Sequence, residues 1–567
     1  MKQANTGAAS SAPVHVPSWA YPAVTVAGLL LGAEAIVRGT RALVTIADSD
    51  LTNFFFRSAD YILAYNPWHM YAVRASGAYP NYNPPLSIFL MAPLLSLARA
   101  VGFNKNPGEL ITFVSIPFMI FVPVLGYMVL RVLRHLYPEI PEAQRFLAYA
   151  LIVLSPLTWQ TYGTWYHIEQ PMMLCLLIGA ILALQQRHEM LAGLLAGLAL
   201  MTRTTALIPL TALGVLLLLG GEWRALLKLA GVGIVVVAVI LGPFFLADRA
   251  DTTYSFLTWR GTAPIGGNSI WTIFAASPGN TGLRHSLDAL ARRLDMPSVI
   301  LLVVVVAAVA ARNRRISAYG RDAWAILAIA ALAVPMLSKT NWPYYYLEPF
   351  VLLLIWEFAS MYDRRAGLWR WPVLSISFLA TAATLSQYLG LQSVGTFDRI
   401  GLGLLEFGAM LTFAILIWLR LQAAKPATAP GFGDLASQRV ASPGGVPQAP
   451  FNLSPQWGSP VPPNQSGWPT WPPPAQPAPG PGSRLQGVEQ GWPPPSQPQP
   501  YGWEAPPFGG AAAPGTGPIR DTPPWQQDAG MIPPPEQWPD LRPAEGRDGW
   551  PGVAPDPYRG PLPGQGQ

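Results

Sequence analysis

The sequence contains little charge and almost no cysteine. Only 12% of its residues are charged, whereas 51% are hydrophobic. The single cysteine, Cys175, lies within an apolar run, so the chain can form neither an intrachain disulfide nor a thiolate metal cluster, and we expect a buried structural thiol. The net charge of +6 comes from arginines that stand in small groups between apolar runs, which is typical of membrane-protein loops and argues against a nucleic-acid partner. These shortages predict a membrane protein.

Proline is abundant but unevenly distributed. More than half of the 61 prolines lie after residue 423, together with glycine, glutamine and tryptophan. Such a composition cannot bury a core and favours extended, solvated chain. We therefore expect a short cytoplasmic N-terminus (1–20), a transmembrane domain (21–422) and a disordered tail (423–567). The tryptophans of the tail could recruit cytoplasmic partners, although a disordered extension dispensable for chemistry is the simpler interpretation.

Long apolar runs predict an all-α fold, a polytopic transmembrane bundle of about twelve spans. The first run is followed by Arg38 and Arg41 rather than by a small-residue cleavage site, so we expect it to remain as an anchor. The run 85–98 is short and contains Pro93, which predicts a segment that dips into the membrane without crossing it. The other runs predict helices at 22–46, 110–133, 146–161, 170–186, 225–247, 297–311, 322–338, 343–360, 371–391 and 400–420, and two shorter helices within 190–220 that break near residues 202–205.

The positions of the basic residues predict the orientation in the cell membrane. If 85–98 does not cross, the basic clusters fall on one side, which the positive-inside rule assigns to the cytoplasm together with both termini. The polar, aromatic-rich stretches then collect on the non-cytoplasmic face, where we expect the active site. These stretches are 47–84, 159–170, 202–205, 248–297 and 338–348.

The first of these stretches begins with an acidic pair, Asp48 and Asp50. Apolar residues at 51, 54, 55, 59, 62 and 63 follow with a helical period and predict an amphipathic helix at the membrane surface, with Arg57 and Asp60 turned toward water. Two interpretations of the acidic pair remain open. It could cap this helix, where aspartate is favoured, or it could supply a catalytic carboxylate.

The arrangement around the pair resembles the C-type integral membrane glycosyltransferases, and within them the polyprenol-phosphate-mannose-dependent α-mannosyltransferases of bacterial envelopes. The matching pieces are Asp50 with its following helix, the segment 82–86 (Tyr-Asn-Pro-Pro-Leu), the Ala/Gly-rich helix that ends at Arg203, and the segment 165–171. The sequence departs from the family pattern at Arg203, where lysine is commoner, and at Asn83, where tyrosine is usual. The likeness covers about residues 22–360.

The resemblance implies a hexosyltransferase that moves a sugar such as mannose from a polyprenyl-phosphate donor to a glycolipid or glycan acceptor, with inversion. This chemistry needs a general base for the acceptor hydroxyl, cations or hydrogen-bond donors for the departing phosphate, and an apolar groove for the polyprenyl chain in the bilayer. We expect Asp50 to be the base and Asp48 to be the second candidate.

The candidate phosphate ligands are Arg203, Arg260 and Lys339. Arg203 lies at the break between two short helices, where a cation is costly unless it has a partner, but an interfacial arginine that snorkels is an equal alternative. Lys339 precedes a tyrosine-rich segment that the interfacial aromatic belt could also explain.

The candidate sugar or acceptor ligands are aromatic, amide and acid–base side chains of the same face. Ordinary loop turns remain the simpler explanation of the glycines between Trp259 and Trp271. His167 and Glu169 lack further ligands at metal-binding spacing, so we expect no dedicated metal site and no required cofactor, although a divalent ion between Asp50, Glu169 and the donor phosphate is left open. The candidates are His167, Glu169, Gln170, Tyr82, Asn83, Trp259, Asn268 and Trp271.

A transporter or flippase of lipid-linked sugar intermediates is the alternative function. Such a protein should carry ionisable groups deep within its spans or show two related halves. The sequence suggests few deep charges and no related halves, which favours the transferase.

Overall fold

The computed structural model describes residues 15–43, 51–64, 66–71, 81, 83–103, 107–258, 265–267, 269–275, 281–361, 371–389 and 396–423. These residues belong to one compact unit of the chain. The predicted cytoplasmic N-terminus lies mostly outside the described residues, and the predicted tail lies outside them from residue 424 onward.

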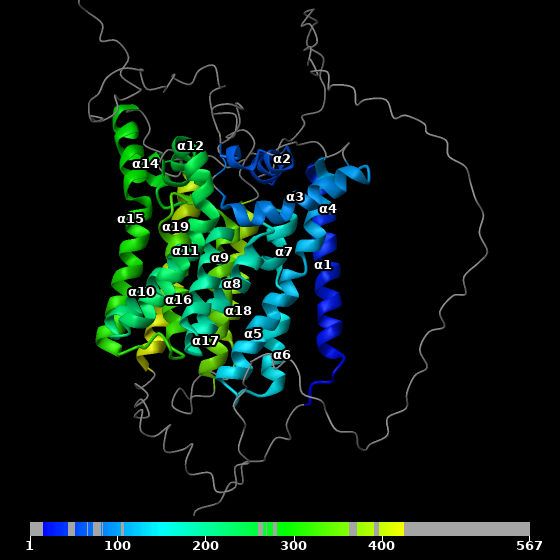
Figure 1. Cartoon of the computed structure of the whole chain (residues 1–567). Helices are drawn as coiled ribbons and strands as arrows, with labels where there is room; N and C mark the ends of the chain where they lie inside the picture. Colours follow the sequence, from blue (N-terminus) through cyan, green and yellow to red (C-terminus); the bar gives the residue numbers. More distant parts are fainter. Residues whose placement is uncertain are drawn as a thin grey trace, which may run out of the picture. The chain divides into compact units, whose positions relative to one another are not determined.

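The described residues are almost entirely helical, which confirms the predicted all-α class (Figure 1). Their two strands, β1 (Gly266–Gly267) and β2 (Thr340–Asn341), pair in parallel and are two residues long. The first half of the chain contains α1 (Ala20–Leu43), η1 (Leu51–Phe56), α2 (Arg57–Leu63), η2 (Pro67–His69), α3 (Pro85–Ala100), α4 (Pro107–Phe118), α5 (Phe121–Leu136), α6 (Glu142–Val153), α7 (Pro156–Gly163), α8 (Gln170–Gln185), α9 (Glu189–Thr202), η3 (Thr204–Ala206) and α10 (Leu207–Leu219). The second half contains α11 (Trp223–Ala247), α12 (Arg249–Thr253), η4 (Tyr254–Thr258), α14 (Thr272–Ala275), α15 (Thr281–Arg314), α16 (Ala323–Leu337), η5 (Pro343–Tyr346), α17 (Leu347–Ser360), α18 (Val373–Leu389) and α19 (Thr396–Ala423).

Several of these helices can cross a membrane by length and composition. Five stretches in the described part of the chain are long and apolar enough: 20–40, 107–136, 223–247, 289–314 and 400–423. Six shorter apolar helices accompany them, among them α8, α9 and α16. The polytopic helical bundle is therefore confirmed, while the number of twelve crossings stays a prediction.

The predicted single helix at 146–161 is wrong. Ser155 is extended (φ −62°, ψ 127°), so the chain forms α6 and α7 with a break between them. The cause is Pro156, because proline disfavours a helical residue before it but suits the first position of a new helix.

The predicted break near residues 202–205 is confirmed. Helix α9 ends at Thr202, Arg203 is extended (φ −158°, ψ 132°), and the chain passes through η3 into α10. The span predicted at 343–360 is α17 preceded by the short η5. The run 85–98 forms the continuous helix α3, which begins at Pro85 and contains Pro93. The prediction that α3 does not cross stays open to test.

The segment predicted as an amphipathic helix is helical, as η1 followed by α2. Leu51, Phe55 and Ala59 are fully buried, whereas Arg57 is exposed. Asp60 is half-buried and forms a two-pronged ion pair with Arg99 of α3. The predicted apolar face is thus confirmed, and it packs inward against the protein.

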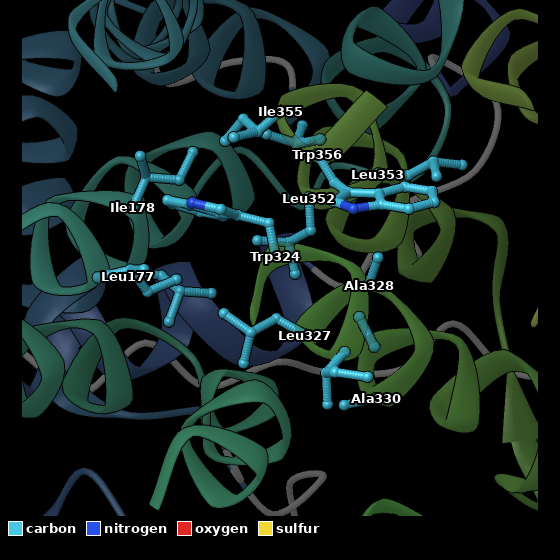
Figure 2. Packing of buried hydrophobic residues seen from close by; sticks show 14 of the residues in the cluster. Leu177, Ile178, Trp324, Leu327, Ala328, Ala330, Leu352, Leu353, Ile355 and Trp356 are labelled. Carbon is cyan, nitrogen blue, oxygen red and sulfur yellow. The ribbon is translucent and has the colours of Figure 1, made fainter. Parts of the chain in front are cut away.

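Helix α16 forms the middle of the largest apolar core. Every residue from Ala323 to Met336 is buried. Figure 2 shows Trp324 of α16 reaching toward Leu177 and Ile178 of α8, with α17 packed alongside. Small alanines on α16 allow close packing of helices on all sides, as in other membrane bundles.

Helix α1 packs against α7 through glycines. A Cβ atom on Gly32 would collide with the ring of Trp159, and a Cβ on Gly39 would collide with the carbonyl oxygen of Gly163. Gly28 and Gly32 stand four residues apart, the small-residue spacing that lets membrane helices approach closely. Glycine is therefore required along this face of α1.

Candidate functional site

Three connections that are far apart in the sequence meet beside one another. They are residues 164–169 between α7 and α8, Arg203 between α9 and η3, and residues 338–346 between α16 and α17. The helices before these connections, α7, α9 and α16, end at Gly163, Thr202 and Leu337. The polar side chains that follow therefore lie on short turns and not on a regular helix.

Arg203, Glu169 and His167 form the centre of this cluster. The Arg203 guanidinium donates to Glu169 Oε1 through Nη1, and the same nitrogen lies 2.9 Å from His167 Nδ1. His167 Nδ1 lies 3.0 Å from Glu169 Oε1. His167 and Glu169 are 1% exposed and Arg203 is 7% exposed, so this is an internal ion pair and not an arginine that snorkels to the surface.

Aromatic rings line the cluster on one side. The Arg203 guanidinium carbon lies 4.6 Å from the ring centre of Tyr344 and 5.7 Å from that of Tyr345. The His167 and Tyr344 ring centres are 3.9 Å apart. The interfacial-belt interpretation of these tyrosines is wrong, because Tyr344 and Tyr345 are buried and stack on the arginine inside the protein.

The charge of Glu169 is stabilised by its neighbours. Burial raises the pKa of this carboxyl, but the adjacent His167 and Arg203 more than offset that effect, so the pKa lies below its ordinary value. Glu169 is therefore ionised at neutral pH and balances the charge of Arg203.

Several buried polar atoms around this ion pair have no hydrogen-bond partner among the described residues. Both amide atoms of Gln170, which is completely buried, belong to this group, as do Glu169 Oε2 and Trp165 Nε1. Buried polar groups in folded proteins are nearly always hydrogen-bonded to protein or water. A concentration of such atoms beside one ion pair is therefore suited to a polar, hydroxyl-rich ligand.

The segment around Lys339 is joined to the glycine-bearing loop before α14. Gly266–Gly267 pairs with Thr340–Asn341, Ser269 Oγ donates to Ser338 O at 2.7 Å, and Trp271 Nε1 donates to Leu337 O at 2.6 Å. Lys339 itself is completely buried, and its backbone N–H donates to Asp295 Oδ1 at 3.0 Å. β1 thus lies against β2, and the indole N–H of Trp271 is hydrogen-bonded to the backbone.

Asn83 is held at the entrance to α3. The Tyr71 hydroxyl donates to its carbonyl oxygen at 3.0 Å, and its N–H donates to Asn81 Oδ1 at 2.9 Å. The side-chain nitrogens of Asn81 and Asn83 are buried without a hydrogen-bond partner in the described part of the chain. Phe55, Tyr71, Ile168 and Met201 belong to one apolar cluster, which connects this segment to the neighbours of Glu169 and Arg203.

Six candidate residues lie outside the described residues: Asp48, Asp50, Tyr82, Trp259, Arg260 and Asn268. The structure thus brings together Arg203, His167 and Glu169, with Gln170 next in the chain. It places Lys339 and Trp271 around β2. Among the described residues there is no group of three metal-binding side chains, and the divalent ion left open above would involve Asp50.

Sequence reasoning missed several buried ionisable groups. Glu348, Glu357 and Glu406 are each 4% exposed or less, and Arg420 is paired with Glu357. Of these three acids, only Glu406 lies in a stretch long and apolar enough to cross a membrane, so the expectation of few deep charges stays a prediction. The available signal was an acid in an otherwise apolar helix, which is rare without a function or a partner.

One comparison with known proteins found a match, to a family model. The sequence model of glycosyltransferase family 87 matches residues 81–338, a stretch that contains His167, Glu169, Gln170 and Arg203. Together with the apolar helical bundle, this match indicates a membrane glycosyltransferase of the C-type integral membrane superfamily. No curated protein and no solved structure matches the chain.

Proposed function

We propose that the protein transfers a hexose such as mannose from a polyprenyl-phosphate donor to a glycolipid or glycan acceptor, with inversion. The observation that carries this proposal is the buried Arg203–Glu169–His167 cluster, inside the region matched by the glycosyltransferase model. The side-chain amide of the neighbouring Gln170 has no hydrogen-bond partner among the described residues. The reaction takes place on the non-cytoplasmic face of the cell membrane, and both termini are cytoplasmic.

Asp50 is the proposed general base, with Asp48 as the second candidate. The carboxylate accepts the proton of the acceptor hydroxyl as its oxygen attacks the anomeric carbon, and the bond to the lipid phosphate breaks on the opposite side. Support comes from the sequence that follows Asp50, because Leu51 and Phe55 are buried in the apolar cluster that also contains Ile168 and Met201.

The phosphate that leaves carries developing negative charge, which cations stabilise. Lys339, Arg260 and Arg203 are the proposed ligands. Arg203 has Glu169 as a counter-charge, and its positive guanidinium would stabilise the phosphate while the pair keeps its position. Gln170, His167, Glu169, Asn83, Tyr82, Asn268, Trp259 and Trp271 are proposed to contact the sugar or acceptor.

The test is a transfer assay. The full chain is produced in cells that otherwise lack the protein, and their membranes are isolated. These membranes receive a panel of labelled polyprenyl-phosphate hexoses and a lipid extract as acceptor. We expect one labelled product whose new linkage is inverted relative to the donor. Asp50→Asn should lower the rate by about 10²- to 10⁴-fold, the usual contribution of a general base.

The matched control is Asp60→Asn, the same chemical change in the same segment at a residue paired with Arg99. Its transfer rate per folded protein should stay near that of the wild type. Full transfer by both Asp50→Asn and Asp48→Asn would overturn the base assignment. Movement of labelled lipid across the bilayer without any transfer would favour the flippase instead, which the buried charges of the bundle also permit.

A further inference from the structure

Helix α19 lies beyond the region that the family model matches, yet one of its faces contacts the candidate site. Glu406 is the seventh residue of a stretch long and apolar enough to cross a membrane, and it is 1% exposed. A carboxyl group at such a position is costly, so its contacts should explain why it is there.

Glu406 is hydrogen-bonded to both ends of the tyrosine-rich segment, residues 341–346. Its Oε1 accepts hydrogen bonds from the Asn341 side-chain amide and from the Tyr346 hydroxyl. The Asn341 amide also donates to Pro335 O at 2.6 Å. Between these two anchors lie Trp342, Tyr344 and Tyr345, the residues whose rings face Trp165, His167 and Arg203.

Gly403 lies on the same face of α19, three residues before Glu406. A Cβ atom at Gly403 would lie 2.6 Å from Ser269 O and 3.2 Å from Thr272 Oγ1. The backbone of the Ser269–Trp271 segment therefore rests directly on α19, and that segment in turn holds Ser338 and Leu337 by hydrogen bonds. Two residues of one helix face thus support both segments around Lys339.

We propose that Glu406 is a positioning residue of the glycosyltransferase site, with Gly403 providing room for the Ser269 backbone. Glu406 does not touch the reacting atoms. It fixes residues 341–346 so that Tyr344 and Tyr345 hold the Arg203 guanidinium against Glu169 and His167. The kinetic part of this inference rests on the proposed function, whereas the geometric part does not.

The chemistry of the carboxyl group predicts which substitution is tolerated. Both described hydrogen bonds end on Oε1, Oε2 has no hydrogen-bond partner, and no ion pair to Glu406 occurs among the described residues. Glutamine keeps an acceptor oxygen at the same place, whereas leucine fills the volume and removes the acceptor. Glu406→Gln should therefore retain function that Glu406→Leu loses.

The first experiment measures transfer per folded protein for Glu406→Leu, Glu406→Gln and the matched control Glu357→Leu. Glu357 is also a completely buried acid, but its partners are Arg420 and α18. We expect Glu406→Leu to lower kcat/KM by about 10- to 100-fold, as remote misplacement of binding groups does. Glu406→Gln should restore most of the rate, and Glu357→Leu should reduce only the amount of folded protein.

A double-mutant cycle separates positioning from simple loss of stability. If Glu406 acts through the tyrosines, the two changes affect the same step. The double variant Glu406→Leu/Tyr344→Leu should then have nearly the same kcat/KM as the less active of the two single variants. Fully multiplicative effects would overturn the proposal. Gly403→Ala should lower kcat/KM as well, whereas Gly408→Ala, where a Cβ meets nothing within 4 Å, should not.

The second experiment needs no activity. Tyr345→Cys in a Cys175→Ser background places a single thiol in the middle of the segment, at a position 8% exposed. Labelling by a small maleimide should be slow in this background and should accelerate by about tenfold or more when Glu406→Leu is added, but not with Glu406→Gln or Glu357→Leu. Equal labelling rates in all four proteins would overturn the positioning role even if no sugar transfer is found, whereas absent transfer with accelerated labelling would contradict only the proposed function.

Discussion

Among the described residues, the arginine–glutamate pairs Arg203–Glu169 and Arg420–Glu357 look alike and differ in one respect. In each pair the arginine also faces an aromatic ring: Tyr344 at 4.6 Å from Arg203, and Trp356 at 5.3 Å from Arg420. Glu357, the partner of Arg420, accepts four hydrogen bonds in the described structure, from the N–H groups of Leu374 and Ser375, from Ser375 Oγ and from Arg420. Both of its oxygens are satisfied, and it caps the start of α18.

The pair at the candidate site is incomplete by comparison. The contacts of Glu169 with His167 and Arg203 both involve Oε1. Glu169 Oε2 and both side-chain amide atoms of Gln170 have no hydrogen-bond partner among the described residues. A satisfied carboxylate that binds a helix start has a structural role. The unsatisfied atoms beside the Arg203–Glu169 pair need partners from outside the described residues, and we propose that the substrate supplies some of them. Burial and charge alone would not have distinguished the two.

The largest effect should come from neutralising each carboxylate. Glu169→Gln and Glu357→Gln both leave a buried arginine without its counter-charge, which costs about 3–5 kcal/mol of stability. Both proteins should therefore melt at lower temperature in detergent, as followed by fluorescence-detected size exclusion. Only Glu169→Gln should also lower sugar transfer per folded protein, by about 100-fold.

Equal transfer losses in the two proteins, once corrected for folded fraction, would remove the functional distinction between the pairs. Arg420→Gln serves as a further control, because it breaks the second pair from the other side and should again affect stability alone.

Gln170→Leu should lower sugar transfer without lowering stability. The Gln170 side-chain amide is buried and has no hydrogen-bond partner among the described residues. Its replacement by an apolar group of similar size should be neutral or stabilising, so the melting temperature should stay or rise. Transfer should nevertheless fall about tenfold, because a lost hydrogen bond to substrate is worth about 1.5 kcal/mol.

Ser375→Ala is the counterpart in the second pair. It removes the 2.7 Å hydrogen bond to Glu357 Oε2 and should cost about 1 kcal/mol of stability with no loss of transfer. A Gln170→Leu protein that is destabilised and fully active would mean that the amide is structural.

The aromatic partners should show a smaller contrast. Tyr344→Leu and Trp356→Leu each remove a ring from beside a buried arginine, an interaction worth about 0.5–2 kcal/mol. Initial-rate measurements should show a raised KM for the lipid donor, by about three- to tenfold, in Tyr344→Leu only. An unchanged KM would indicate that Tyr344 packs against Arg203 without influencing substrate.

The smallest effect concerns pH. The pKa of Glu169 is lowered in the folded protein, so its contribution to stability is present above the ordinary value of 4.5 and is lost as the pH falls through the lowered folded pKa. The melting difference between wild type and Glu169→Gln should therefore be constant from pH 6 to 8 and shrink in acid. A difference that shrinks near neutral pH would show that the carboxyl is not ionised there.

Much of the helical layout follows from the sequence because it depends on local patterns. The break at residues 202–205 and the apolar face of the 51–63 segment were predictable from the apolar pattern. The packing of that face against the protein was not predicted, because the sequence suggested a helix on the membrane surface. The break before Pro156 was missed because an apolar run suggested one helix, although the proline itself carried the signal.

The site depends on contacts between distant residues, which one sequence does not reveal. Arg203 and Glu169 were each candidates, but their pairing arises only when α9 folds beside α8. The tyrosines at 344 and 345 seemed typical of a membrane interface, and only the tertiary structure places them on an arginine. Glu406 acquires its role from partners at positions 341 and 346.

The glycine face of α1 has a consequence for the order of biosynthesis. Gly28, Gly32 and Gly39 fit against residues of the α6–α7 region, such as Trp159 and Gly163. The ribosome makes α1 first and α7 only after α2 to α6, so the glycine face of the nascent chain must remain covered by lipid, or by an insertion factor, until α7 arrives. Final docking of the first span is thus a late event in assembly.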